Sequence, residues 1–283
     1  MVHQVKPVPQ GAWDTHHHIF EPDRFPFSAG RHFTPSVATL EDLQKFEASI
    51  GVAHVCIAHG LSYGPDCTSL LYYLDQLQGT ARGICVIDER NVTDDLLEKY
   101  HAAGVRSVRL AFFKAQAMHD LQKQIDLIKA TAERLLRWKP NGNGWSIQIQ
   151  QPILSHWNMT PDGAPLAISQ PGWQDLLESM ADGNIWVKIS APYRNSRNDP
   201  IYDDLERIVK DLVQANPKRV VWGSDWPHTQ RHEDRHLRGR EDVEPFLKID
   251  NKRWVETLSI WLSEAEWNDL WVNNPRKLYD YEA

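Results

Sequence analysis

The chain has 283 residues, a formal net charge of −7 at pH 7 and a hydrophobic share of 41%, with 12 Trp residues. This length suits one large domain or two small ones, and the apolar share supplies a sizeable core, which argues against intrinsic disorder. The acidic charge and the lack of a Lys/Arg-rich block argue against nucleic acid as a partner. No apolar run approaches the roughly 20 residues that cross a bilayer, so we expect no membrane partner.

Short apolar or β-branched runs alternate with longer amphipathic stretches along the chain. In chain order, strands are predicted at residues 12–17, 53–58, 82–87, 105–112, 145–150, 184–190 and 219–223. Between them, apolar residues recur at the three-to-four spacing of helices, as in Leu40, Leu43, Phe46 and Ile50, and in Leu121, Ile125 and Ile128. Thr93 predicts a helix start, and Gly104 predicts its end.

Strands separated by helices in this way predict a parallel α/β sheet. The chain length favours a distorted TIM-type (β/α)8 barrel, formed by residues 1–283 as a single domain, with its site at the carboxyl ends of the strands. Only seven strands are clear, however. One βα unit, around residues 151–172, is predicted to be shortened or missing, with Leu166 to Ser169 as a candidate for a stunted eighth strand.

Three consecutive histidines end the first predicted strand, in the stretch WDTHHHIF from Trp13 to Phe20. Because side chains alternate along a strand, His16 and His18 are expected on one side and His17 on the other. Two imidazoles would then meet at the barrel mouth. The alternative is a surface cluster of histidines.

A second polar group ends the last strand, where Val220 to Gln230 reads VVWGSDWPHTQ. Asp225 lies where this strand ends, and His228 follows a turn stiffened by proline. Asp is also a common cap residue, so a structural role stays open. In a closed barrel the last strand neighbours the first, which would place Asp225 opposite His16 and His18 as a water-activating group.

Arginines and hydroxyls follow other strands. Arg109 lies inside an apolar strand and needs an anionic partner, either a structural carboxylate or a substrate carboxylate. Arg194 follows the strand at 184–190 and is a second candidate for binding a carboxylate. Ser62 and Tyr63 could bind substrate through their hydroxyls, or they could be ordinary loop residues.

The three cysteines fit neither a disulfide framework nor a zinc site. They are therefore expected to be reduced, and the N-terminus lacks the apolar core of a signal peptide. Both features predict a cytoplasmic protein. The sequence carries no signal for an oligomeric state.

Taken together, these motifs resemble the amidohydrolase superfamily, and most closely its pyrone-dicarboxylate lactonase branch. The resemblance rests on DTHHHIF, FPF (Phe25 to Phe27), RHFTP (Arg31 to Pro35), SYGPD (Ser62 to Asp66), VRLAFF, KISAPYR, WGSDWPH and NNPRKLY in this order. It covers the chain from about Trp13 to Tyr279.

The resemblance implies hydrolysis of a lactone ring that carries carboxylates, in the breakdown of aromatic compounds. It implies Asp225 as general base, His16 and His18 as carbonyl-polarising groups, and Arg109 and Arg194 as carboxylate binders. His228 would orient the base or the substrate. The motif of form DHxG that this branch carries is absent between the strands at 145–150 and 184–190, and Lys114 or Ala115 stands where the branch has a further arginine.

A metal-free reaction is the expectation, because no mid-chain histidine of that motif is present to complete a metal site. If zinc or another divalent metal is bound, His16, His18 and Asp225 are its candidate ligands. Two alternatives stay open: a zinc-dependent decarboxylase of an aromatic or muconate acid, and a non-catalytic relative.

Overall fold

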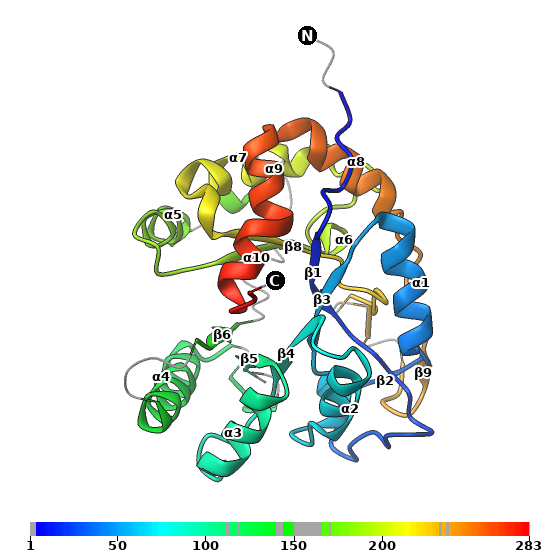
Figure 1. Cartoon of the computed structure of the whole chain (residues 1–283), viewed down its shortest axis with the longest axis vertical. Helices are drawn as coiled ribbons and strands as arrows, with labels where there is room; N and C mark the ends of the chain where they lie inside the picture. Colours follow the sequence, from blue (N-terminus) through cyan, green and yellow to red (C-terminus); the bar gives the residue numbers. More distant parts are fainter. Residues whose placement is uncertain are drawn as a thin grey trace.

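The protein is described by a computed structural model that covers residues 4–110, 112, 114–117, 119–139, 144–149, 166–169, 171–231, 234–235 and 238–282. Its central feature is a parallel sheet that curls into a half-barrel, with helices arranged around the outside (Figure 1). The coarse prediction of a parallel α/β fold is thus confirmed.

In the described part of the chain, seven strands build the curled sheet. Five of them pair in the order β1 (Trp13–His17), β3 (His54–Ala58), β4 (Ala81–Cys85), β5 (Val105–Arg109) and β6 (Ser146–Gln148). The strands β7 (Val187–Ser190) and β8 (Val220–Gly223) form a second parallel pair. β8 continues into β1 through backbone hydrogen bonds of 2.8 Å from Asp225 N to His16 O and from His18 N to Trp226 O. The spatial order is therefore β7, β8, β1, β3, β4, β5, β6.

Each predicted strand lies within a few residues of an observed one. Apart from them, Thr34–Pro35 (β2) and Val243–Glu244 (β9) form a short pair that the sequence pattern does not reveal. Leu166–Ser169 is a 3-10 turn, so the prediction of a stunted strand there was wrong. Ile168 of this turn packs against a cluster of helical side chains instead of joining a sheet. The rest of the predicted shortened unit lies largely outside the described residues.

Most of the described helices cover the outer face of the sheet, but the shortest of them follows β7 at the carboxyl ends of the strands. The helices are α1 (Leu40–Ile50), α2 (Thr68–Gln76), α3 (Asp94–Ala102), α4 (Leu121–Trp138), α5 (Trp173–Ala181), α6 (Pro192–Asn195), α7 (Glu206–Ala215), α8 (Asn251–Trp261), α9 (Glu264–Asn268) and α10 (Asn274–Leu278), with a π-helical turn at Asp269–Asn273. As predicted, Thr93 caps α3, since its hydroxyl accepts a hydrogen bond from Leu96 N. None of the described helices is long and apolar enough to span a membrane.

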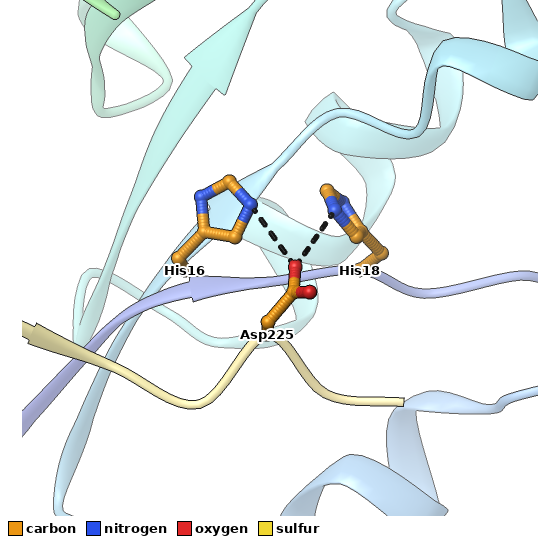
Figure 2. A group of neighbouring side chains, drawn as sticks. All are labelled: His16, His18 and Asp225. Atoms are coloured by element: carbon orange, nitrogen blue, oxygen red, sulfur yellow. Dashed lines mark ion pairs between the residues drawn. The ribbon is translucent and has the colours of Figure 1, made fainter. Parts of the chain in front are cut away.

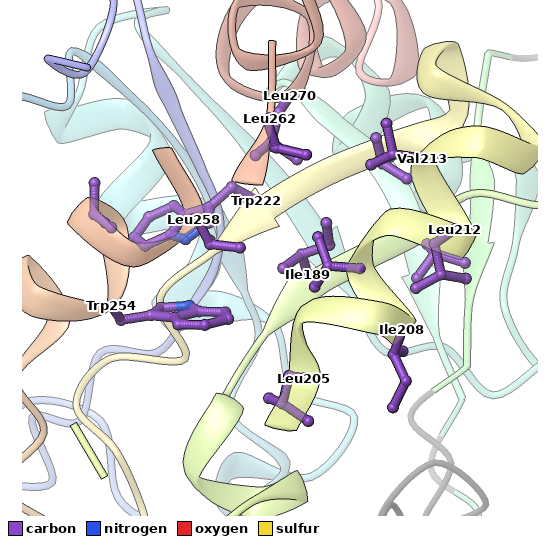
Figure 3. Close-up of a cluster of buried hydrophobic side chains, with 14 of the residues drawn as sticks. Ile189, Leu205, Ile208, Leu212, Val213, Trp222, Trp254, Leu258, Leu262 and Leu270 are labelled. Carbon is purple, nitrogen blue, oxygen red and sulfur yellow. The ribbon is translucent and has the colours of Figure 1, made fainter. Parts of the chain in front are cut away.

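The apolar faces of these helices bury the outward side chains of the strands. Figure 3 shows one such cluster, in which Ile189 and Trp222 of β7 and β8 pack against residues of α7 and α8 such as Leu212 and Leu258. Since Val187 and Ile189 face these helices, the intervening Lys188 faces the interior of the half-barrel. By the same alternation, Ile147 packs outward and Gln148 faces inward. The inward residues are free to build a polar site.

The interior is closed at one end by the C-terminal segment. Tyr279 is 1% exposed and packs with Cys56, Ala58 and Ile84 of β3 and β4. All three cysteines are buried free thiols. The carboxyl ends of the strands lie at the other end, where the polar motifs of the sequence meet.

Candidate active site

The carboxylate of Asp225 lies at the junction of β8 and β1, facing two imidazoles. Its Oδ1 atom is 3.4 Å from Nε2 of His16 and 3.9 Å from Nε2 of His18 (Figure 2). All three side chains are nearly buried, with residue exposures of 4 to 6%. The sequence prediction that these three residues converge agrees with this geometry.

The backbone around Asp225 requires a close approach of two strands. A Cβ atom added to Gly223 would lie 2.8 Å from Cβ of His16, closer than atoms of this kind pack. Asp225 itself has a φ of 61°, in the left-handed region that Asp and Asn tolerate best after glycine. Glycine at 223 therefore lets β8 press against β1, and the turn that follows aims the carboxylate at the histidines.

His17 points away from this group, as the alternation of side chains predicts. Its ring lies with the carboxyl groups of Asp14 and Glu47, and Nδ1 of His17 is 3.6 Å from Oδ2 of Asp14. Burial, reinforced by the negative charge of Asp14, raises the pKa of Glu47 well above its usual range. These three residues join β1 to α1 behind the site.

Burial sets the protonation of the facing pair. It lowers the pKa of His18 to about 3, with a further contribution from the positive charge of Arg109. Burial also lowers the pKa of His16 well below its usual value, and the nearby Lys188 adds to this effect. Both imidazoles are therefore neutral at pH 7.

Asp225 is ionised in the same environment. Burial alone would raise the pKa of its carboxyl, but the positive charge of Arg194 and the hydrogen bond from the Tyr193 hydroxyl bring it below the usual range. The Tyr193 hydroxyl donates to Oδ2 at 2.6 Å, and Nε of Arg194 donates to the same atom at 2.9 Å. Oδ2 is thus held by two donors, and Oδ1 faces the imidazoles.

Arg194 was predicted to bind a substrate carboxylate, yet the carboxylate that it contacts is Asp225. Its other hydrogen bonds go to the loop after β8: NH1 donates to Gln230 O at 3.2 Å, and NH2 donates to the backbone and side-chain oxygens of Thr229. Four of its five N–H groups are used in this way. This geometry makes Arg194 an anchor for Asp225.

Arg109 extends from β5 into the same interior and is 5% exposed. Its NH1 group donates to His59 O at 3.3 Å. Burial lowers the pKa of Arg109 to about 10, so the guanidinium stays charged at neutral pH. A buried cation near His18 and Asp225 remains a candidate for binding an anionic group of a ligand.

Comparison with known proteins identifies the family of this chain. The model of the amidohydrolase family matches residues 13–150 and 151–281. The chain belongs to the amidohydrolase family.

The chain shares about a quarter of its residues with individual relatives. The chain is 25% identical to a 4-sulfomuconolactone hydrolase of Hydrogenophaga intermedia, over 99% of this chain and 94% of that protein. It is 27% identical to a 2-pyrone-4,6-dicarboxylate hydrolase of Comamonas testosteroni, over 78% of each. Among solved structures, an apo structure from Agrobacterium tumefaciens superposes with a TM-score of 0.73 at 23% identity, over 98% of both chains.

His228 of this amidohydrolase was expected to orient Asp225 or the substrate. Its backbone N–H donates to Asp225 O at 2.9 Å, but its ring points toward α8, where Nε2 lies 2.7 Å from Nδ2 of Asn251. A T-shaped contact with Phe46 of α1 holds the ring on the same side. The His228 ring also makes a T-shaped contact with Tyr193, with 5.7 Å between the ring centroids. His228 therefore supports Asp225 through its backbone N–H and through packing against Tyr193, while Nε2 of its ring faces Asn251.

Ser62 and Tyr63, the candidate hydroxyl donors, have partners in the protein. The Ser62 hydroxyl lies 3.4 Å from Phe33 O, and the Tyr63 hydroxyl accepts a bond of 2.8 Å from the backbone N–H of Glu21. Tyr63 also packs in an aromatic cluster with Phe20. These contacts favour the reading of both residues as loop residues that shape the mouth.

Sequence reasoning missed three polar side chains of the site. These are Tyr193, Gln148 and Lys188, each of which contacts Asp225 or His16 directly or through one neighbour. A signal was available for Lys188, since a charged residue at the centre of a short apolar strand requires partners. Tyr193 directly precedes Arg194, but nothing in the pattern indicates that its hydroxyl reaches Asp225.

Proposed function

We propose that this protein hydrolyses a small lactone ring that carries carboxylate groups, with Asp225 as the base that activates water. The observation that carries the proposal is the ionised, anchored carboxylate of Asp225 facing two neutral imidazoles in a buried site. The named activities of two relatives, which open a sulfomuconolactone and a pyrone dicarboxylate, support the same chemistry.

Positive groups near the mouth suit a substrate with carboxylates. Arg109 lies deep in the site, and a planar guanidinium binds carboxylates well. Lys114 follows β5 and, with Arg31, lines a hollow at the carboxyl ends of the strands. A ring bearing two carboxylates would place one toward Arg109 and the other toward Lys114. Lys114 thereby takes the place expected for a second arginine.

Attack on the lactone needs water between Asp225 Oδ1 and the ring carbonyl. Asp225 takes a proton from this water as its oxygen bonds to the carbonyl carbon, and a neutral imidazole donates a hydrogen bond to the developing oxyanion. The ring C–O bond then breaks and the ring oxygen leaves as a delocalised enolate. This group takes up the proton held by Asp225, which restores the carboxylate and yields the ring-opened acid. A carboxylate with a lowered pKa is a weak base, which a delocalised leaving group can tolerate.

The fold and location follow the same proposal. We infer that the half-barrel is a distorted (β/α)8 barrel whose unit between β6 and β7 is shortened. The free cysteines fit a cytoplasmic location, and the named activities of the relatives fit a role in the breakdown of aromatic compounds.

A catalytic zinc ion fits this donor set poorly. His18 Nδ1 must donate to Ala58 O, which lies 2.7 Å away, so its Nε2 has a free lone pair. His16 Nδ1 lies 3.0 Å from the amide nitrogen of Gln148, which has only hydrogens to offer, so Nε2 of neutral His16 carries a proton. Ligand atoms of His16, His18 and Asp225 lie within 4.8 Å of one another, close enough to hold a metal ion. In this hydrogen-bonding arrangement, however, only two of the three, His18 Nε2 and the Asp225 carboxylate, offer free lone pairs, whereas catalytic zinc sites usually have three protein ligands.

A zinc-dependent decarboxylase, the alternative function, would need a third protein ligand for its zinc ion, and this cluster of described residues offers two. Metal analysis of protein purified without chelators tests the point, and we expect substoichiometric zinc that falls further on dialysis without loss of activity. One tightly held zinc per chain, required for activity, would contradict the metal-free mechanism.

The function itself is tested by a screen of carboxylated lactones, including 2-pyrone-4,6-dicarboxylate and 4-sulfomuconolactone, with acid release as the readout. We expect Asp225→Asn to lower kcat by about 10³-fold, because loss of a positioned base has effects of about 10²–10⁴. Full activity of Asp225→Asn would contradict the assignment and favour a non-catalytic relative.

A further inference from the structure

Two side chains meet between β6 and β7, two strands that are not paired through their backbones in the described part of the chain. Lys188 of β7 donates from Nζ to Oε1 of Gln148 on β6, at 3.0 Å. The same ammonium donates to the backbone oxygen of Thr15 at 2.6 Å. Lys188 therefore ties three strands together directly below the candidate site.

The lysine fixes how the Gln148 amide is turned. An ammonium group has three hydrogens and no lone pair, so the group that faces it must be the amide oxygen. Burial lowers the pKa of Lys188 to about 8, which leaves it protonated at neutral pH. With its oxygen toward Lys188, the amide directs its nitrogen at Nδ1 of His16, 3.0 Å away.

We propose that Lys188 and Gln148 are positioning residues that hold His16 in its Nε2–H tautomer, opposite to the Nδ1–H tautomer of His18. Gln148 donates to Nδ1 of His16, which leaves the ring proton on Nε2, facing Asp225 at 3.4 Å. His18 donates from Nδ1 to Ala58 O and presents a lone pair at Nε2. The two histidines thus differ in chemistry although they share one face of β1.

The difference divides their roles, and this step rests on the proposed function. His16 is the member of the pair that can donate a hydrogen bond to the carbonyl oxygen of the lactone. His18 can only accept one, which suits it to orient the attacking water beside Asp225. We call the chain of hydrogen bonds from Lys188 through Gln148 to His16 the relay. It also explains why β7 carries a charged residue that faces the interior, since Lys188 determines through Gln148 which nitrogen of His16 carries the proton.

The tautomers can be measured without any substrate. Protein labelled with ¹⁵N at its 13 histidines is studied at pH 7 by two-bond ¹H–¹⁵N correlation, and His16→Asn and His18→Asn variants identify the two rings. We expect Nε2–H for His16 and Nδ1–H for His18. An Nδ1–H tautomer for His16 in the unmodified protein would overturn the proposal.

Two variants test the relay. Gln148→Glu keeps the shape and the contact with Lys188 but offers only acceptors to His16, so we expect Nδ1 of His16 to become protonated. Lys188→Met removes the ammonium that turns the amide, so we expect a mixture of His16 tautomers. Gln76→Glu and Lys45→Met, on exposed faces of α2 and α1, are matched controls that should leave the His16 signals unchanged. If Lys188→Met does not fold, Gln148→Glu carries the test alone.

Kinetics supply the second readout. With a hydrolysed lactone, we expect Lys188→Met to lower kcat about tenfold or more with little change in KM, since the oxyanion donor acts in the transition state. An unchanged His16 tautomer in both variants would overturn the relay even if activity falls. Conversely, the expected tautomers in a protein that opens no lactone would leave the relay intact and reject the proposed function.

Discussion

Tyr193 and Arg194 are adjacent in the chain, and both donate to the same oxygen of Asp225. Their side chains hold the carboxylate in one rotamer, in which its second oxygen, Oδ1, faces the imidazoles of His16 and His18. The same contacts lower the basicity of Asp225, because they stabilise its charged form. Anchoring and base strength are therefore opposed at this residue.

Tyr193→Phe separates these two effects. We expect the pKa of Asp225 to rise, because one hydrogen bond to the carboxylate is lost, and kcat at pH 7 to fall about tenfold through looser positioning, since about 1.4 kcal/mol is one factor of ten. The pH–rate profile on a lactone substrate measures both. Tyr202→Phe removes an equally short bond of 2.6 Å to the carboxylate of Asp199, away from the site, and should leave the profile unchanged. Equal effects of the two variants would show that Tyr193 acts only on stability.

Arg109 makes a prediction about the substrate. If its guanidinium binds a carboxylate, Arg109→Met should raise KM for a dicarboxylate by about 10²-fold, because a charge-assisted bond contributes about 1.5–3 kcal/mol. KM for the corresponding mono-ester should change far less. Equal weakening of both ligands would mean that Arg109 is structural.

Arg106→Met is the matched control for this measurement. Arg106 lies on the same strand, three residues earlier, and its side chain contacts His101 O and Asp280 at the far end of the sheet. Its loss should leave the preference for the dicarboxylate as it is. A shift in that preference would indicate that changes anywhere on β5 reach the site.

At the scale of elements, the site depends on how closely β8 packs against β1. Gly223 ends β8, and its missing side chain is the space that His16 occupies. We expect Gly223→Ala to destabilise the fold by about 1–3 kcal/mol, as overpacking usually does. Because the strain acts on His16, kcat should fall as well.

Urea unfolding and lactone kinetics on the same variant measure these two effects. Gly239→Ala is the control, since a Cβ there would meet only the exposed, flexible side chain of Asp242. It should change neither quantity by much. If Gly223→Ala changes neither the free energy of unfolding nor kcat, β8 and β1 have room to separate.

The sequence predicts elements better than it predicts contacts between them. Alternation and apolar runs locate all seven strands and place His16 and His18 on one face, because these signals are local. The convergence of Asp225 with them follows from the rule that first and last strands of a barrel are neighbours. The partners of Arg194 and the relay from Lys188 depend on side-chain directions across strands, which no local pattern encodes.

At the scale of the whole molecule, the fold buries several histidines as neutral rings. Burial lowers the pKa of His18 to about 3 and that of both His59 and His228 to about 4, and it lowers the pKa of His16 as well. In the unfolded chain each ring would titrate near its ordinary value of about 6.5. Between these values the unfolded state binds more protons than the folded state.

Stability should therefore decrease as the pH falls from about 6.5 toward 4, and it should be insensitive to these rings above pH 7.5. Each buried neutral ring contributes up to about 1.4 kcal/mol per pH unit in this window, so the loss between pH 7 and 4.5 should reach several kcal/mol. Urea unfolding at half-unit steps of pH measures the slope. His228→Asn, which removes one such ring without touching the Asp225 carboxylate, should make the slope shallower. A free energy of unfolding that stays constant from pH 7 to 4.5 would mean that the rings accept protons in the folded state. The assignment of His16 and His18 as neutral rings facing Asp225 would then be wrong.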